Sequence, residues 1–357
     1  MRIALISTAA FPTPPEGYGG TETMVAELAR GLVDLGHQVL VYATGDSSCA
    51  GDVKARFPVG TWPPSDAAEQ EHAAFAFGDL SRRDVDVVHV HSAAALRAHR
   101  SCAAPCFLTM HHDRQAELVS LYRSFPEVRL VAVSERQRAL HPELAFAGVV
   151  HHGIDPGAFD FGGGVTGYAA FVGRFCEDKG VHLAIDAALA ADVPLILGGA
   201  PRPAFDDAER YFLTEVQPRI RANADRIMWL GELRHRAKVA LLRDARALLF
   251  PIQWEEPFGL VMIESMLVGT PVIAFDRGSA REVIEEGVTG FIVGSEREMG
   301  ARLRQLKGFD RARCRERAAE RWSTARMTAE YVALYESALR ARVDGAPRSA
   351  GGVRDAA

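Results

Sequence analysis

Short apolar segments rich in β-branched residues alternate with segments of helical periodicity, and this alternation constrains the fold more than any other feature. RIALIS at residues 2–7 is followed by the turn-rich PTPPEGYGG and then by TETMVAELARGLVDLGH, whose apolar residues recur at helical spacing up to Gly36. The apolar segment QVLVYAT at residues 38–44 completes a strand–helix–strand unit. Such units place their strands in parallel, so the sequence predicts an α/β fold with a parallel sheet.

The same pattern continues in two series on either side of a glycine-rich segment. Further strands of the first series are predicted at residues 84–92, 105–112 and 128–134. GIDPGAFDFGGGVTGY at residues 153–168 has no apolar period and is typical of a linker. Strands of the second series are predicted at residues 168–174, 193–200, 226–233, 247–252, 270–275 and 290–293. The sequence therefore predicts two facing Rossmann-like domains, at residues 1–155 and 165–325, with a cleft between them.

The C-terminal part of the chain is helical in pattern and rich in arginine from Met299 to Ala341. We expect its last helix, at about residues 326–342, to pack back on the N-terminal domain. Residues 343–357 have the composition of a disordered tail. The arginines could face a membrane surface, giving weak contact with lipid, although solvated helix faces explain them more simply.

Length, charge and cysteine usage exclude several classes of protein. A chain of 357 residues exceeds what one hydrophobic core usually covers, and a net charge of −5 does not favour a nucleic-acid partner. The cysteines are scattered and odd in number, which fits a reducing compartment, and the spacing of Cys102 and Cys106 is weak support for a metal site. Because no segment reaches the roughly 18 apolar residues of a membrane span, we predict a cytoplasmic protein. The oligomeric state cannot be inferred.

The segment WEEPFGLVMIESMLVGTPVIAFDRGSAREVIEEGVTGFIV, residues 254–293, carries the densest set of chemical signals. Glu256 and Glu264 lie eight positions apart, so on one helix their side chains point within roughly 80° of each other. The intervening PFG would open the helix and leave backbone N–H groups free to bind an anion. The alternative is that both glutamates are ordinary helix residues, and the spacing alone does not decide between these interpretations.

This segment resembles the signature region of family 4 of the retaining glycosyltransferases, which have the GT-B fold of two facing Rossmann-like domains. Three other motifs support the resemblance. FVGRFCEDKG at residues 171–180 is similar to the family's G-R-x-x-x-x-K-G, GYGGTE at residues 17–22 to its N-terminal glycine loop, and HHGID at residues 151–155 to its N-G-[IV]-D. Their order and spacing agree across about 320 residues.

The resemblance implies a role for each residue of these motifs. Arg174 and Lys179 would stabilise the departing diphosphate. These two fixed cations would take the place of the metal ion that other transferases use. Glu264 would bind the ribose hydroxyls, since a carboxylate accepts two hydrogen bonds. Glu256 would lie beside the hydroxyls of the donor sugar, and His111, which ends a predicted strand, would contact the reacting sugar.

Further contacts are implied around these residues. Gly19 and Gly20 would let backbone approach the diphosphate, although a tight turn explains these glycines equally well. The resemblance implies that Glu22 lies near the acceptor. It implies the same for His112 and Asp113 with less support. The remaining residues implied to bind nucleotide or sugar are Gly231, Leu233, Phe258, Gly259 and Leu260. The sequence departs from the family at His152, where asparagine is usual, and in SMLVGTP after Glu264.

The expected function is metal-independent transfer of a hexose, with retained configuration, from a nucleotide-diphosphate sugar to an acceptor hydroxyl. UDP-hexose is the first choice of donor and GDP-mannose the second, and no cofactor is required. The acceptor, whether saccharide, lipid or small molecule, would bind N-terminal loops such as 45–80 and 112–125. Glu256 is a better ligand for sugar hydroxyls than a covalent nucleophile, and the departing phosphate oxygen could take the acceptor's proton.

Other functions fit the sequence less well. A dinucleotide-dependent oxidoreductase would need G-x-G-x-x-G directly after the first strand, which GYGGTE does not match. A nucleotide-sugar epimerase could share the fold and the nucleotide site. An inactive nucleotide-binding protein would be expected to have lost Arg174, Lys179 or Glu256, and all three are present.

Overall fold

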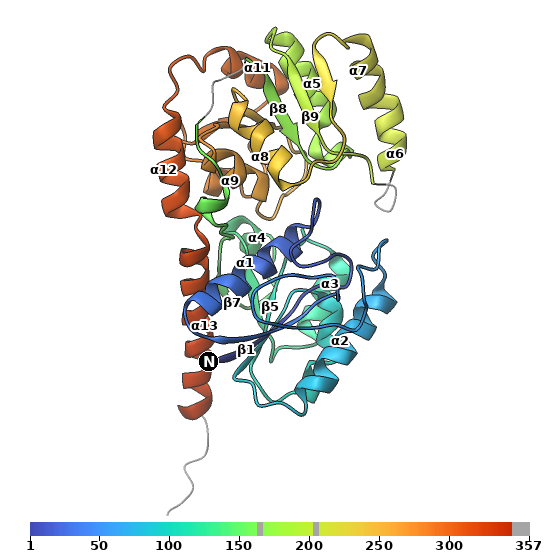
Figure 1. Cartoon of the computed structure of the whole chain (residues 1–357), viewed down its shortest axis with the longest axis vertical. Coiled ribbons are helices and arrows are strands. Elements are labelled where there is room, and N and C mark those ends of the chain that lie inside the picture. The colour runs from blue at the N-terminus through green and yellow to red at the C-terminus, as the bar shows by residue number, and fades with distance from the viewer. Residues whose placement is uncertain (163–166, 203–206, 345–357) are drawn as a thin grey trace, which may run out of the picture.

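Figure 1 shows the computed structural model as two α/β domains stacked along the long axis of the molecule, with the last helix returning to the N-terminal domain. The structure describes residues 1–162, 167–202 and 207–344. The predicted tail at residues 343–357 lies outside the described part except for its first two residues.

Seven parallel strands form the N-terminal sheet, in the order β3-β2-β1-β4-β5-β6-β7. The strands are β1 (Arg2–Ile6), β2 (Gln38–Tyr42), β3 (Asp52–Lys54), β4 (Val87–Val90), β5 (Cys106–Thr109), β6 (Arg129–Ala132) and β7 (Phe146–Val149). The helices are α1 (Gly20–Asp34), α2 (Asp66–Leu80), α3 (Ala116–Arg123) and α4 (Glu135–Ala139), with 3₁₀ turns η1 (Ala93–Arg97), η2 (His99–Ser101) and η3 (Pro156–Ala158). Strands β4 and β5 are buried along their whole length, as expected where helices cover both faces of a parallel sheet.

Sequence patterns predicted the inner strands of this sheet and missed its edges. Each predicted strand contains an observed one, and α1 is followed by Gly36 in the left-handed region, with φ of 80°. Edge strands β3 and β7 were not predicted, because DVK and FAGV are too short to show an alternating pattern. The description of residues 45–80 and 112–125 as loops is wrong, since they contain α2 and α3.

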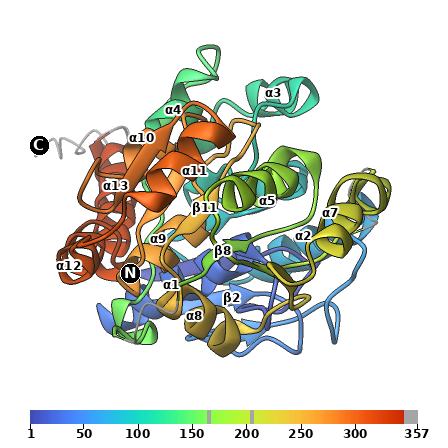
Figure 2. The same ribbon diagram turned by 90° about the horizontal axis from the view of Figure 1, so that it is seen from above.

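Six parallel strands form the C-terminal sheet, in the order β10-β9-β8-β11-β12-β13. The strands are β8 (Ala169–Val172), β9 (Leu195–Gly198), β10 (Ile227–Trp229), β11 (Leu248–Phe250), β12 (Val272–Phe275) and β13 (Gly290–Val293). Its helical elements are η4 (Glu177–Lys179), α5 (Val181–Ala190), α6 (Ala208–Tyr211), the π-helical η5 (Phe212–Val216), α7 (Gln217–Ala222), α8 (His235–Asp244), α9 (Leu260–Leu267), α10 (Ala280–Val283), α11 (Glu296–Arg304) and α12 (Arg311–Arg321). Seen from above, α5 and α11 lie side by side over this sheet (Figure 2). All the strands predicted for the second series are present.

The chain crosses between the domains twice, and the two crossings lie side by side. Ile154 donates its backbone N–H to the carbonyl of Trp322 (2.9 Å) and accepts one from Thr324 (3.2 Å). A Cβ on Gly153 would lie 2.3 Å from the carbonyl oxygen of Ser323, so only glycine allows this approach. The paired segments form the connection between the domains.

The final helix, α13 (Thr324–Asp344), runs along the N-terminal domain beside α1 (Figure 1). Tyr331 and Tyr335 on this helix are buried against the sheet. The hydroxyl of Tyr335 lies 2.6 Å from Nδ1 of His89, and that of Tyr331 lies 2.8 Å from Oγ1 of Thr109. These hydrogen bonds join the C-terminus of the chain to strands β4 and β5.

Several arginines of the C-terminal segment bind backbone carbonyls rather than solvent or lipid. Arg311 donates to the carbonyl of Ala245 (2.8 Å), and Arg315 donates to that of Phe159 (2.6 Å). Arg326 donates to two carbonyls just before Gly153 (both 2.8 Å). The interpretation as a solvated helix face is therefore wrong for these three arginines, whereas Arg304, Arg313 and Arg317 are exposed as it predicts. Within residues 1–162, 167–202 and 207–344, no helix is long and apolar enough to cross a membrane.

Candidate active site

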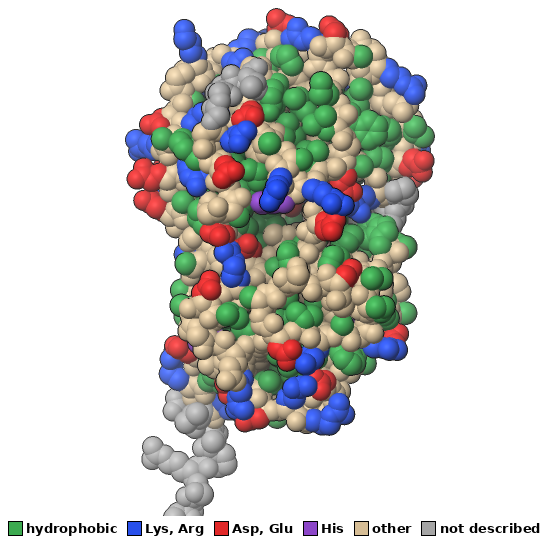
Figure 3. Space-filling view, in the orientation of Figure 1, with side chains coloured by type: hydrophobic (Ala, Val, Ile, Leu, Met, Phe, Trp, Pro, Cys, Tyr) green, Lys and Arg blue, Asp and Glu red, His purple; other side chains and the backbone are tan. Residues whose placement is uncertain are grey.

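A cavity of about 320 Å³ lies between the domains, where the carboxyl ends of the two sheets meet. The strand order reverses between β1 and β4 in one sheet and between β8 and β11 in the other. Ligands of open α/β sheets bind at such switch points. Figure 3 shows Lys and Arg side chains gathered along the boundary between the domains on one face. The predicted residues that line the cavity are Gly19, Gly20, His111, Arg174, Lys179, Leu233, Glu256, Phe258, Gly259, Leu260 and Glu264.

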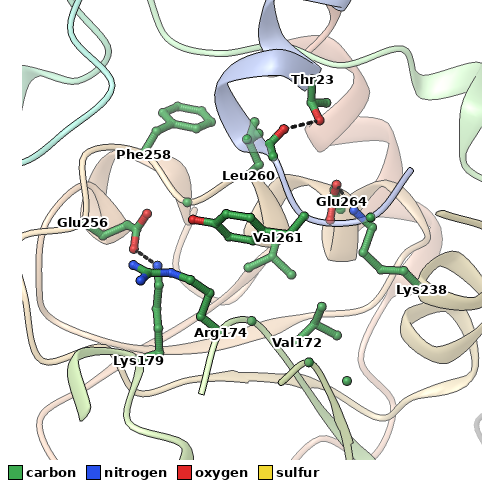
Figure 4. A pocket seen from close by; sticks show the side chains of 18 of the residues that line it. Thr23, Val172, Arg174, Lys179, Lys238, Glu256, Phe258, Leu260, Val261 and Glu264 are labelled. Atoms are coloured by element: carbon green, nitrogen blue, oxygen red, sulfur yellow. Dashed lines mark hydrogen bonds and ion pairs between the residues drawn. The ribbon is translucent and has the colours of Figure 1, made fainter. Parts of the chain in front are cut away.

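Arg174 and Lys179 follow β8 at the edge of the C-terminal sheet that faces the cleft. Lys179 ends the turn η4, and the next residue, Gly180, has φ of 68°. A Cβ on Gly180 would lie 2.1 Å from the carbonyl oxygen of Pro251, so glycine is required where the loops after β8 and β11 touch. The loop after β8 thus places both cations on the wall of the cavity (Figure 4).

Lys179 forms an ion pair with Glu256 inside the cavity (Figure 4). Both side chains are mostly buried, with exposures of 15% and 12%. Trp254 donates its Nε1–H to the same carboxylate at 2.8 Å, and its ring lies 4.9 Å from Nζ of Lys179. Three side chains from two loops are therefore held as one unit.

The helical argument that related Glu256 to Glu264 is wrong. Helix α9 begins only at Leu260, and Gly259 before it has φ of 82°. Glu256 therefore lies in the loop after β11, where its carbonyl accepts the N–H of Ser279 at 3.1 Å. The prediction that PFG precedes a helix is confirmed.

Glu264 lies on α9 and pairs with Lys238 of α8 at 2.5 Å (Figure 4). Its carboxylate is 7% exposed and Lys238 also lines the cavity. Sequence reasoning missed Lys238, although a signal was present. As the fourth residue of α8 its charge is unfavourable near a helix N-terminus unless an anion lies close by.

The N-terminal domain contributes the loop before α1. Gly19 has φ of 148°, and its carbonyl accepts the hydroxyl hydrogen of Thr23 at 2.8 Å. Tyr18 donates its backbone N–H to Glu232 across the cleft at 3.1 Å. Arg202 completes this contact, because it donates to the same carboxylate at 2.5 Å and its guanidinium carbon lies 4.6 Å from the centre of the Tyr18 ring. The sequence analysis missed Tyr18 and Arg202 as lining residues.

His111 contacts two other histidine rings on the N-terminal side of the cavity. Its Nε2 is 2.9 Å from Nδ1 of His91, and its ring stacks on His152 at 5.3 Å between centroids. Burial lowers the pKa of His111 to about 3 and lowers the pKa of His91 and His152 well below the ordinary value. All three rings are therefore neutral at physiological pH.

Four predicted residues do not line the cavity. Glu22 is buried behind Gly19 and accepts the hydroxyl hydrogen of Thr8, and burial raises its pKa to about 7. The ring of His112 is hydrogen-bonded to Tyr122 and its neighbour Asp113 lies outside the lining. Gly231, with φ of 75°, shapes the turn after β10 and accepts the N–H of Gly199 at 2.7 Å.

The structure describes no cluster of three or more His, Cys, Asp or Glu side chains that could hold a metal ion within residues 1–162, 167–202 and 207–344. The cations that line the cavity are Arg174, Lys179, Arg202 and Lys238. The cavity is thus suited to a ligand with negative charge and several hydroxyl groups.

Two family profiles match the chain in the two domains that enclose this cavity. The profile described as Glycosyltransferase Family 4 matches residues 18–157, and that described as Glycosyl transferases group 1 matches residues 166–321. The chain belongs to the family 4 glycosyltransferases. This transferase is 26% identical to a phosphatidyl-myo-inositol mannosyltransferase of Mycolicibacterium smegmatis, with 97% of each chain covered. It is also 28% identical to a glycogen synthase of Mycobacterium tuberculosis, with 81% of each covered.

Solved structures confirm the predicted GT-B fold of the transferase. AviGT4, a glycosyltransferase involved in avilamycin A biosynthesis, aligns with a TM-score of 0.75 at 24% identity, covering 96% of this chain and 98% of its own. The Anabaena protein HepE, in complex with UDP-glucose, aligns with a TM-score of 0.73 at 18% identity, covering 94% and 100%.

Proposed function

We propose that the transferase moves a hexose from a nucleotide-diphosphate sugar to an acceptor hydroxyl, with retained anomeric configuration and without a metal ion. The observation that carries the proposal is the position of Arg174 and Lys179 on one wall of the interdomain cavity. Negative charge on a diphosphate grows as the glycosidic bond breaks, and fixed cations stabilise that charge most strongly in the transition state. These two residues would therefore hold the leaving group.

Glu256 would bind the hydroxyls of the donor sugar. Its carboxylate already accepts from Lys179 and Trp254, so it is poorly suited to attack an anomeric carbon. The acceptor would therefore approach from the face that the diphosphate leaves, and the departing phosphate oxygen would take the acceptor's proton. If Glu256 were instead a nucleophile, mass spectrometry with a slow acceptor would detect a glycosyl-enzyme, and this adduct would overturn the assignment.

UDP-hexose is the first candidate donor and GDP-mannose the second. HepE, which shares the fold, was crystallised with UDP-glucose, and this likeness supports the first candidate. The name of the mannosyltransferase from M. smegmatis supports a mannosyl donor. The relatives' names also suggest acceptors of two kinds, a lipid headgroup for that enzyme and a glucan for the glycogen synthase.

A binding panel tests the donor site before the acceptor is known. Thermal shift and calorimetry would be measured with UDP, GDP, ADP, dTDP and their sugars, for the wild type, Arg174→Ala and the exposed control Arg210→Ala. We expect saturable stabilisation by one nucleotide, lost only in Arg174→Ala and unchanged by EDTA. No response to any nucleotide, or equal loss in both variants, would overturn the proposed site. Release of an epimerised nucleotide sugar without acceptor would instead indicate an epimerase.

A further inference from the structure

Among the residues that the structure describes, His111 makes one side-chain hydrogen bond, which leaves one of its ring nitrogens for a ligand. Its Nε2 lies 2.9 Å from Nδ1 of His91, whereas the ring itself lines the cavity. His91 is 6% exposed and follows β4 at the switch point of the N-terminal sheet. Nδ1 is thus the nitrogen of His111 that can bind a substrate hydroxyl.

The surroundings of His91 decide which of the two rings donates this hydrogen bond. Nε2 of His91 is buried and has no hydrogen-bond partner among the residues that the structure describes. If His111 donated, His91 would carry its hydrogen on that buried Nε2, and buried N–H groups without an acceptor are rare in folded proteins. If His91 donates from Nδ1, only a lone pair is left without a partner. The second arrangement is favoured.

Aromatic packing fixes the plane of the His111 ring. The ring of His152 stacks on it, with 5.3 Å between centroids and an interplanar angle of 20°, and the hydrogen-bonded ring of His91 lies at 5.2 Å with an angle of 32°. His152 in turn packs against Phe258 of the C-terminal domain at 5.0 Å. The histidine that replaces the asparagine usual in the family thus supports His111 from the interdomain segment.

We propose that His91 is a positioning residue, which donates its Nδ1–H to Nε2 of His111 and so holds His111 as the tautomer with hydrogen on Nδ1. That Nδ1–H would donate to a hydroxyl oxygen of the hexose. This inference rests on the proposed function only in naming the hexose as the ligand. The tautomer itself is a property of the protein without ligand.

The tautomer can be measured directly by long-range ¹H–¹⁵N correlation spectra of protein labelled with ¹⁵N-histidine. His111 is assigned by the signal that His111→Gln removes. We expect hydrogen on Nδ1 of His111 in the wild type and in His91→Asn. The asparagine amide carries an N–H near the position that Nδ1 of His91 occupies, so it can still donate to His111. We expect the other tautomer or a mixture in His91→Leu and His91→Gln. Hydrogen on Nε2 of His111 in the wild type would overturn the proposal, as would an unchanged tautomer in both disruptive variants.

Binding gives a second measurement that separates this role from a purely structural one. The ratio of the dissociation constants of UDP and UDP-glucose, or of GDP and GDP-mannose if the panel selects GDP, reports the sugar contacts alone. We expect that ratio to fall about fivefold to tenfold in His91→Leu and His91→Gln and to stay near the wild-type value in His91→Asn. Equal ratios in all variants would contradict the proposal.

Two controls keep the test decisive. His99→Leu removes a buried histidine whose Nδ1 bonds the carbonyl of Leu96 at 2.6 Å outside the cavity, so it should change neither measurement. If His91→Leu does not fold, the two polar variants still test the proposal. His91→Asn keeps an N–H donor near the position of Nδ1, whereas His91→Gln moves the donor away from it. Absence of nucleotide binding in the wild type would refute the proposed function but leave the tautomer result intact.

Discussion

Lys179 and Glu256 form an ion pair within the cleft, although they are 77 residues apart and belong to loops after two different strands. A donor diphosphate entering the cavity would compete with Glu256 for Lys179, whereas a donor hexose would offer hydroxyls to Glu256. If the proposed function holds, Lys179 and Glu256 would each exchange this partner for a part of the donor.

Neutralising Glu256 should separate binding of the nucleotide from transfer of the sugar. Glu256→Gln frees Lys179 for phosphate, so we expect UDP or GDP to bind about 5-fold to 30-fold more tightly, since a charged hydrogen bond contributes roughly 1–2 kcal/mol. Transfer should fall about 100-fold, because a preorganised contact to the reacting sugar is lost. Calorimetry and kcat/KM measure the two effects.

The matched control for that experiment is the neighbouring Glu255→Gln. Glu255 pairs with Arg136 at 2.9 Å and does not line the cavity. Its replacement should leave the affinity for the nucleotide near that of the wild type. Parallel effects of the two substitutions would show that domain contacts, rather than Lys179, determine the affinity.

Breaking the pair between Lys238 and Glu264 should destabilise the C-terminal domain. Lys238→Met leaves a carboxylate that is 7% exposed without its partner, so we expect a loss of about 2–3 kcal/mol in the free energy of unfolding. The double variant with Glu264→Gln should recover more than half of this loss. Urea unfolding of both, with exposed Arg236→Met as control, measures the coupling, and additive losses would contradict it.

Glu22 should make stability fall as the pH rises towards neutrality. Burial raises its pKa to about 7, so between about pH 4.5 and pH 7 the folded state binds more protons than the unfolded state. The free energy of unfolding should therefore decrease by about 3–4 kcal/mol over this range and then level off. Glu22→Gln should lack the decrease, whereas exposed Glu71→Gln should retain it. Identical pH profiles for the wild type and Glu22→Gln would refute the assignment.

Arg202 should help to keep the cleft closed. It belongs to the C-terminal domain, is 16% exposed, and lies over the N-terminal rings of Tyr18 and Trp62 at 4.6 and 5.1 Å. Loss of these cation–π contacts, about 1–2 kcal/mol in total, should lower the ratio of closed to open molecules roughly tenfold in Arg202→Ala. Small-angle X-ray scattering should then show a larger radius of gyration than for Arg210→Ala. Equal radii would show that other contacts hold the domains together.

The sequence by itself determined that the chain forms two parallel sheets, and it determined which charged side chains follow the ends of their strands. Burial on both faces forces apolar strands, and glycines such as Gly180 and Gly259 mark where the backbone must adopt conformations unfavourable for other residues. Arg174, Lys179 and Glu256 could be found because they lie in local motifs beside these features. The helical relationship assumed for Glu256 failed because Gly259 delays the start of α9.

Only the tertiary structure decided which of these groups meet. The Lys238–Glu264 pair, the contact of Arg202 with Tyr18, and the ring contacts of His111 join residues from different helices and loops and, for Arg202, from different domains. Periodicity reports the face of an element that is buried, and it carries no information on the partner across a cleft. That partner depends on how the interdomain segments at Ile154 and Ser323 set one sheet edge against the other.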